Sequence, residues 1–191
     1  MPKKKVAAVS AKGQTTITVT PLPREILEVP IRGVTPLIVN HLGGKTRQEM
    51  ADIEAGIKKP RGPRDPVSEY EESFYRLTDG RYGFPLTAFK SCTVSACRFY
   101  DRSVSMQAVK QYLWFEPEYY DDEGIALVPL EYDEDSPRMR CDPVRLRNGG
   151  TTLRYRPEFT NWSTVVKVRY VKSSINMDSV LELMNAGGLD V

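Results

Sequence analysis

The chain of 191 residues contains one histidine, His41, and three cysteines, so the residues that most catalytic triads and zinc sites need are scarce. Cys92, Cys97 and Cys141 are odd in number and lack CxxC spacing, which argues against a disulfide framework and a structural zinc site. No GxGxxG, P-loop, GxSxG or HExxH motif occurs. The sequence therefore predicts no catalysis and no cofactor.

Long apolar runs are also absent. None approaches the roughly 18–20 residues that a membrane-spanning helix needs, and the basic start at residues 1–5 lacks the apolar stretch of a secretory signal. Hydrophobic residues make up 40% of the chain, which is enough for one core, and the length does not fit two full domains. We expect a cytoplasmic protein with a basic N-terminal arm at residues 1–24 and a single domain at residues 25–191.

The formal net charge of +2 conceals segregated charges. Residues 1–66 and 138–156 are basic, whereas residues 116–135 are rich in acids. Such segregation suits a protein that binds a polyanion with one face and stacks on itself with another. The alternative is that these segments are solvated loops without a partner.

The hydrophobic patterns predict an α+β fold. The expected elements are a weak strand at 15–20, a first core strand at 25–40, a short helix at 46–57, a hairpin at 73–85, a helix at 86–100, strands at 125–130, 151–156 and 162–171, and a helix at 176–186 capped by Gly187-Gly188. Residues 103–115 fit a helix or a strand equally well. This order predicts a modified ferredoxin-like, or RNA-recognition-motif-like, core with a mobile basic insertion at residues 43–66 after the first core strand. A fourth core strand should follow the last helix, so either that strand is minimal or the chain is truncated.

Arginines at i, i+2 spacing are the strongest feature that the residues themselves offer. The pairs are Arg138/Arg140, Arg145/Arg147 and Arg154/Arg156. In an extended strand this spacing places both guanidinium groups on one face, where they match phosphate geometry. Trp162 follows closely and supplies a stacking surface of the kind that single-strand binders use. The alternative is that these arginines pair with the acidic stretch or with a neighbouring subunit.

Two further features bear on chemistry. His41 directly follows the first core strand, and a lone histidine at a strand end is more often a hydrogen-bonding or phosphate-contacting residue than a general base. The acidic runs at 121–123 and 133–135 would suit a metal in a nuclease, but consecutive side chains in an extended chain point apart. We therefore interpret these runs as solvated loops and expect no metal site.

The segment at residues 83–98, GFPLTAFKSCTVSACR, resembles the signature that opens the first helix of RAMP superfamily proteins. Phe84-Pro85 matches the apolar–proline pair, Lys90 the lysine and Arg98 a basic position near the helix end, while residues 86–88 are Leu-Thr-Ala where the family has Gly-Ser-Ser. The segment PLIVN at 36–40, with its long insertion, is similar to the family's first strand and thumb region. The chain also resembles uncharacterised phage and prophage proteins of this kind.

The resemblance implies a non-catalytic subunit that binds single-stranded nucleic acid, with RNA favoured, and assembles side by side like the backbone subunits of CRISPR effector complexes. Lys90 would contact phosphate, and the insertion with Lys45 and Arg47 would reach a neighbouring segment. The host compartment would be the bacterial cytoplasm. The alternatives are a phage protein that binds or anneals single-stranded DNA, a phage anti-CRISPR protein that mimics an effector subunit and, least favoured, a metal-dependent nuclease.

Overall fold

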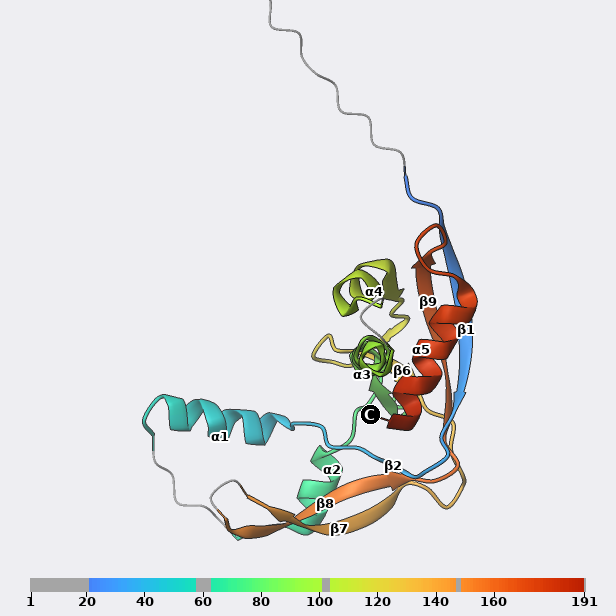
Figure 1. The fold of residues 1–191 in the computed structure, drawn as a ribbon. Helices are drawn as coiled ribbons and strands as arrows, with labels where there is room; N and C mark the ends of the chain where they lie inside the picture. Colours follow the sequence, from blue (N-terminus) through green and yellow to red (C-terminus); the bar gives the residue numbers. More distant parts are fainter. Residues whose placement is uncertain (1–20, 58–62, 101–103, 147–148, 191) are drawn as a thin grey trace, which may run out of the picture.

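The computed structural model describes residues 21–57, 63–100, 104–146 and 149–190. Within them the chain forms five α-helices, one 3₁₀ helix and three small antiparallel sheets, so the fold class is α+β as predicted (Figure 1). In chain order the elements are β1 (Arg24–Arg32), β2 (Leu37–Ile38), α1 (Gly44–Glu54), α2 (Pro66–Glu72), β3 (Gly83–Pro85), α3 (Leu86–Ser95), η1 (Ala96–Phe99), α4 (Met106–Tyr112), β4 (Leu113–Phe115), β5 (Tyr119–Tyr120), β6 (Ala126–Pro129), β7 (Arg138–Arg145), β8 (Thr151–Phe159), β9 (Ser163–Val171) and α5 (Met177–Asp190). The weak strand predicted at 15–20 lies outside the described residues.

The main sheet has the order β1–β9–β4, and β9 runs antiparallel to both neighbours. Val166, Val168 and Tyr170 of β9 are buried in the larger core, which α3 and α5 complete. The residues between them point to the opposite, open face, because successive side chains of a strand alternate. The strand predicted at 162–171 is therefore confirmed as β9, with one face toward the larger core and the other away from it.

The second sheet has the order β2–β8–β7 and lies across the bottom of the view in Figure 1. Helix α2 packs against β8. A smaller core of Val39, Phe74, Leu130 and Phe159 lies beside it. Trp162 packs against both cores, at the point where the chain passes from β8 to β9. The third sheet, β3–β6–β5, is short.

The first core strand predicted at 25–40 is wrong as a single element. The chain forms β1 up to Arg32 and then β2, which pairs with β8 in the second sheet. Gly33 makes the break: its N–H donates to the Trp162 carbonyl oxygen, and a Cβ on it would lie 2.0 Å from Nε1 of Trp162. Val34, which the pattern placed in the core, is 82% exposed.

The predicted hairpin at 73–85 is only partly present. Gly80 has φ +88° in the turn, as the Asp-Gly signal implies. The ladder is reduced to one bridge between Arg76 and Tyr82, because residues 83–85 pair with β6 instead. The undecided segment at 103–115 contains both candidates, since α4 is followed directly by β4.

The helix predicted after Pro85 is confirmed as α3, and its last turn is the 3₁₀ helix η1. On this helical segment Cys97 is buried and Cys92 is partly buried. The closing helix is longer than expected, because α5 runs through Gly187 and Gly188 to Asp190. The predicted glycine cap is therefore wrong.

Helix α1 confirms the short helix predicted in the insertion and projects to the left of the body in Figure 1. The insertion ends at the start of a helix that the sequence did not indicate, α2, whose N-cap Asp65 accepts the Val67 N–H. Residues 58–62, on which the prediction of a mobile loop mainly rests, lie outside the described residues. No helix in the described part of the chain is long and apolar enough to cross a membrane.

Candidate nucleic-acid interface

Strands β7 and β8 form a long antiparallel hairpin that collects most of the predicted arginines. Arg138 lies opposite Glu158, Arg140 opposite Arg156, and Asp142 opposite Arg154. Directly opposed residues of an antiparallel pair point to the same side of the sheet. The four arginines therefore share one side with Asp142 and Glu158, and we call this side the arginine face. Four guanidinium groups against two carboxylates leave it a formal charge of +2.

Most of these arginines already have carboxylate partners. Arg140 bonds to Asp142 at 2.9 Å and to Glu158 at 2.7 Å, and Arg156 bonds to Asp142 at 2.9 Å. Hydrogen bonds from Arg140 and, to a smaller extent, Arg156 hold the pKa of Asp142 below its ordinary value. The carboxylate partners thus lie mainly within the hairpin rather than in the acidic stretch that the sequence suggested.

The two remaining arginines of this face are more open. Arg138 is exposed and pairs at 3.1 Å with Asp135, which belongs to the acidic stretch. Arg154 is exposed and has no hydrogen bond or ion pair with any residue that the structure describes. Arg154 is therefore the guanidinium on this face that could bind an anion without displacing a carboxylate.

The opposite side of the hairpin differs in character. Tyr155 and Arg145 lie there because their positions alternate with those of the arginine face. Arg64, from the end of the insertion, donates to the Leu153 carbonyl oxygen at 2.6 Å and to Thr152 Oγ1 at 2.7 Å, and Thr152 itself lies on the side of the arginine face. Glu69 of α2 orients this guanidinium and raises its pKa. Arg147 lies outside the described residues.

Trp162 is held in place on both sides. Its Nε1 donates to the Thr35 carbonyl oxygen at 2.9 Å, and its ring lies against Gly33. The side chain is half-buried and packs against both cores. This geometry favours a structural role at the corner between the sheets, and stacking on a base stays a prediction.

The other predicted contacts do not join the arginine face. Lys90 is half-buried in α3, and Arg98 is exposed in η1; neither has a partner within the described part of the chain. Lys45 belongs to α1, which projects from the body. Sequence reasoning thus grouped residues that the fold distributes over three elements.

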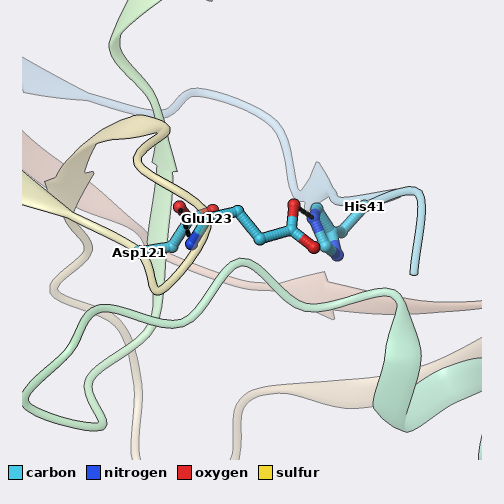
Figure 2. Close-up of side chains that lie close together, drawn as sticks. All are labelled: His41, Asp121 and Glu123. Atoms are coloured by element: carbon cyan, nitrogen blue, oxygen red, sulfur yellow. Dashed lines mark hydrogen bonds and ion pairs between the residues drawn. The ribbon is translucent and has the colours of Figure 1, made fainter. Parts of the chain in front are cut away.

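His41 and Arg47 meet at a different carboxylate. Arg47 Nη1 lies 2.5 Å from Oε2 of Glu123, and His41 Nε2 lies 3.7 Å from the same oxygen. Asp121 completes this group (Figure 2). A small crevice of about 70 Å³ lies beside His41, and Arg154 and Tyr155 contribute to its lining. The crevice therefore brings His41 near the middle of β8.

The open face of the main sheet is unsuited to a polyanion. Lys167 pairs with Glu28 at 3.2 Å and with Glu118 at 2.5 Å, and Arg169 pairs with Glu116 at 3.0 Å. A hollow of about 470 Å³ on this side is lined by four glutamates and only two basic residues: Glu28, Glu116, Glu118 and Glu131, with Arg32 and Lys167. Excess carboxylates repel phosphate.

Comparisons with family models, with curated proteins and with solved structures give no match for this chain. The resemblance to the RAMP superfamily therefore rests on the residues quoted above.

Sequence reasoning missed the carboxylates that decide how free each arginine is. Asp142 alternates with Arg140 in the same strand, so the i, i+2 rule that grouped the arginines also predicts that contact. Glu158 and Arg64 gave no such signal, because their contacts depend on strand register and on the path of the insertion.

Proposed function

We propose that this protein binds single-stranded nucleic acid on the arginine face, without catalysis, and that copies assemble side by side along the strand. The observation that carries the proposal is the placement of Arg138, Arg140, Arg154 and Arg156 on one side of the hairpin. A planar guanidinium fork matches two phosphate oxygens, and a row of such forks follows a phosphate backbone.

The ion pairs within the hairpin do not prevent this binding. Arg140 is 42% exposed, and ion pairs between exposed groups contribute only about 0–1 kcal/mol. A phosphate can therefore exchange with Asp142 or Glu158 at low cost, and it meets Arg154 without any exchange. The contact pattern predicts that Arg154 and Arg138 contribute more to binding than the paired Arg140 and Arg156.

The strand order of the main sheet supports a ferredoxin-like core. Strands β1 and β4 are both antiparallel to β9, so they run in the same direction with β9 between them. Helix α3 lies between β1 and β4 in the chain, and α5 follows β9. This arrangement corresponds to three strands and two helices of the split βαβ pattern. The arrangement agrees with the interpretation of residues 83–98 as a segment that resembles the RAMP superfamily signature.

In a typical RNA-recognition motif the open sheet face binds the bases. In this chain the glutamates on that face disfavour such a site, so we assign binding to the hairpin. The same glutamates offer a surface for a basic patch on a neighbouring copy, which is consistent with side-by-side assembly.

The test is the salt dependence of oligonucleotide binding, measured by fluorescence anisotropy with single-stranded RNA and DNA of equal length. For single strands the slope of log affinity against log salt is about −0.7 per neutralised phosphate. Changing both Arg138 and Arg154 to alanine should flatten the slope by about 1.4 and weaken binding about 25-fold at 0.1 M salt.

Arg145→Ala is the matched control, because it removes one exposed arginine from the other side of the same hairpin. It should leave the slope nearly unchanged. Equal slopes for the double variant and the wild type would refute the arginine face. A wild-type protein that retains no oligonucleotide at low salt would favour the alternative of a phage protein that mimics an effector subunit through protein contacts.

The comparison of RNA with DNA separates the remaining alternative. Phosphate contacts do not distinguish the sugars, whereas contacts to the 2′-hydroxyl do. Equal affinity for both strands would favour a phage protein that binds or anneals single-stranded DNA over an RNA-binding backbone subunit.

A further inference from the structure

We propose that His41, Asp121 and Glu123 form a binding site for one divalent metal ion of the zinc type. One ligand atom from each residue lies within 4.8 Å of the others. Figure 2 shows the imidazole of His41 facing the Glu123 carboxylate, with Asp121 beside the backbone of Glu123. The proposal is independent of nucleic-acid binding.

The His41 ring is oriented as a metal ligand would be. Its Nδ1 lies 3.4 Å from the Glu72 carbonyl oxygen, which can only accept, so this contact places the proton on Nδ1. The Tyr75 ring packs on the imidazole at 4.6 Å in an edge-on arrangement. Metal-bound histidines usually donate their second N–H to a carbonyl or carboxylate in this way.

The environment of the other ring nitrogen, Nε2, indicates a cation site. The side chain of His41 is only 13% exposed, and Nε2 is shielded from solvent without a hydrogen-bond partner among the described residues. In the neutral ring this atom carries a lone pair, and it faces the Glu123 carboxylate at 3.7 Å. A shielded lone pair without a hydrogen-bond partner that faces a carboxylate oxygen is stabilised by a cation between the two atoms.

The spacing between His41 and Glu123 fits zinc coordination. Zinc bonds of about 2.0–2.1 Å to nitrogen and 2.0–2.2 Å to oxygen place two tetrahedral ligands about 3.4 Å apart. The distance of 3.7 Å between His41 Nε2 and Glu123 Oε2 therefore needs an adjustment of only a few tenths of an ångström. A donor set of one imidazole and two carboxylates suits zinc, cobalt or manganese, whereas magnesium prefers oxygen ligands alone.

Asp121 is positioned by its own turn. Its Oδ1 accepts the N–H of Glu123 at 3.0 Å and that of Ile125 at 2.7 Å. These bonds fix the carboxyl group at the start of the turn between β5 and β6. Three protein ligands would leave the fourth zinc position to a water molecule.

Arg47 sets the strength of the site. Its guanidinium pairs with the same Glu123 oxygen that faces His41, so it neutralises the carboxylate when no metal ion is bound. A metal ion must displace this partner, because both cations use Oε2. Arg47 therefore acts as a competitor, and its removal should strengthen metal binding.

The experiment is calorimetric titration of the untagged protein with Zn²⁺, together with visible absorption during Co²⁺ titration and Mg²⁺ as the negative control. The background carries Cys141→Ser, because Cys141 is an exposed thiol that binds zinc by itself. We expect one Zn²⁺ per chain. At a hundredfold excess over Kd the melting temperature should rise by about 5–10 °C.

The variants locate the site. His41→Ala and Glu123→Gln should each weaken Zn²⁺ binding at least 100-fold, beyond the roughly 10–100-fold that loss of a supporting contact costs. Asp122→Asn is the matched control, because this exposed carboxylate lies in the same turn but outside the cluster, and its affinity should equal that of the background. Arg47→Gln should bind about 1.5- to 5-fold more tightly.

Three results would overturn the site: no saturable Zn²⁺ binding in the background protein, equal loss of affinity in Asp122→Asn and Glu123→Gln, or weaker binding in Arg47→Gln. If His41→Ala fails to fold, as judged by circular dichroism, Glu123→Gln decides the question, because its side chain is 36% exposed and removing its charge empties no core position.

Discussion

Gly187 is the position where α5 approaches α3 most tightly among the glycines of that helix. A Cβ built on Gly187 would lie 2.8 Å from the carbonyl oxygen of Cys92, 2.9 Å from its carbonyl carbon and 3.2 Å from the Thr93 nitrogen. All three are backbone atoms, which cannot rotate away as a side chain can. Gly187→Ala therefore has to separate two helices that close the larger core.

The size of the effect follows from two opposing terms. Overpacking of a well-packed contact costs about 1–3 kcal/mol, whereas replacing glycine by alanine inside a helix gains at most about 1 kcal/mol. The net loss of unfolding free energy for Gly187→Ala is therefore up to about 3 kcal/mol. In a domain of this size each kcal/mol corresponds to about 2–4 °C, so the melting temperature should fall by up to about 12 °C.

Gly188→Ala is the matched control in the same helix. A Cβ there would meet no atom within 4 Å, so only the gain in helix propensity remains. That gain should be smaller than 1 kcal/mol in the last turn, where helix ends fray. Gly188→Ala should therefore raise the melting temperature by about 1–3 °C.

The assay is thermal unfolding followed by circular dichroism, with urea unfolding to obtain the free energies. Opposite signs for the two variants would confirm the packing role of Gly187. If Gly187→Ala stabilised the protein as much as Gly188→Ala, the close approach of α5 to α3 would be refuted, and the predicted glycine cap would regain support.

The remaining predictions concern the hairpin and the corner. Asp142→Asn should tighten oligonucleotide binding two- to fivefold at low salt, because the arginine face gains one net charge and Arg140 and Arg156 lose a competing partner; anisotropy measures it. The pKa of Asp142 is lowered in the folded state, so its contribution to stability is complete above the ordinary aspartate value of about 3.9 and is lost as the pH falls through the lowered value. Asp142→Asn should therefore unfold with a smaller dependence on pH below about pH 4, measured by urea unfolding. Trp162→Phe should lose about 1–3 kcal/mol of unfolding free energy with its bond to the Thr35 carbonyl oxygen, while oligonucleotide affinity stays unchanged; a weaker affinity at full stability would instead support stacking.

The hydrophobic pattern and the helix-start signals predicted several individual strands and helices correctly. The strand β9 and the helix that begins after Pro85 follow directly from alternation and from the helix-start signal. The sequence did not predict which strands pair with one another in the sheets. Residues 36–40 look like a continuation of β1, and only the contact of Gly33 with Trp162, 129 residues further along the chain, redirects them into the second sheet.

The glycine pair at the C-terminal end illustrates a second limit. Glycines near a helix end usually mark the cap, because they adopt positive φ without strain. At Gly187 the reason for glycine is the neighbouring helix α3, which no local pattern contains. The local rule therefore recognised that glycine is needed at this position but assigned it to a helix cap instead of to a close contact between two helices.

The predicted site was grouped by charge, by spacing along the chain and by the resemblance, and the fold separated its members by register. Alternation correctly placed Arg138 with Arg140 and Arg154 with Arg156, and the hairpin register then joined the two pairs. The sequence could not place His41 beside Glu123, because the end of β2 and the turn between β5 and β6 meet only through the packing of two sheets.

Ion pairing divides the basic residues of this chain into two kinds. Lys167 and Arg169 lie on a sheet face where glutamates outnumber them, so ion pairs within the molecule neutralise their charge. On the hairpin the arginines outnumber their carboxylates, and Arg154 has no partner among the described residues. A strand of phosphates gains attraction only from the uncompensated charge, because a paired guanidinium must first give up a carboxylate. The hairpin, rather than the open face of the main sheet, is therefore the surface to which we assign the proposed binding of a polyanion.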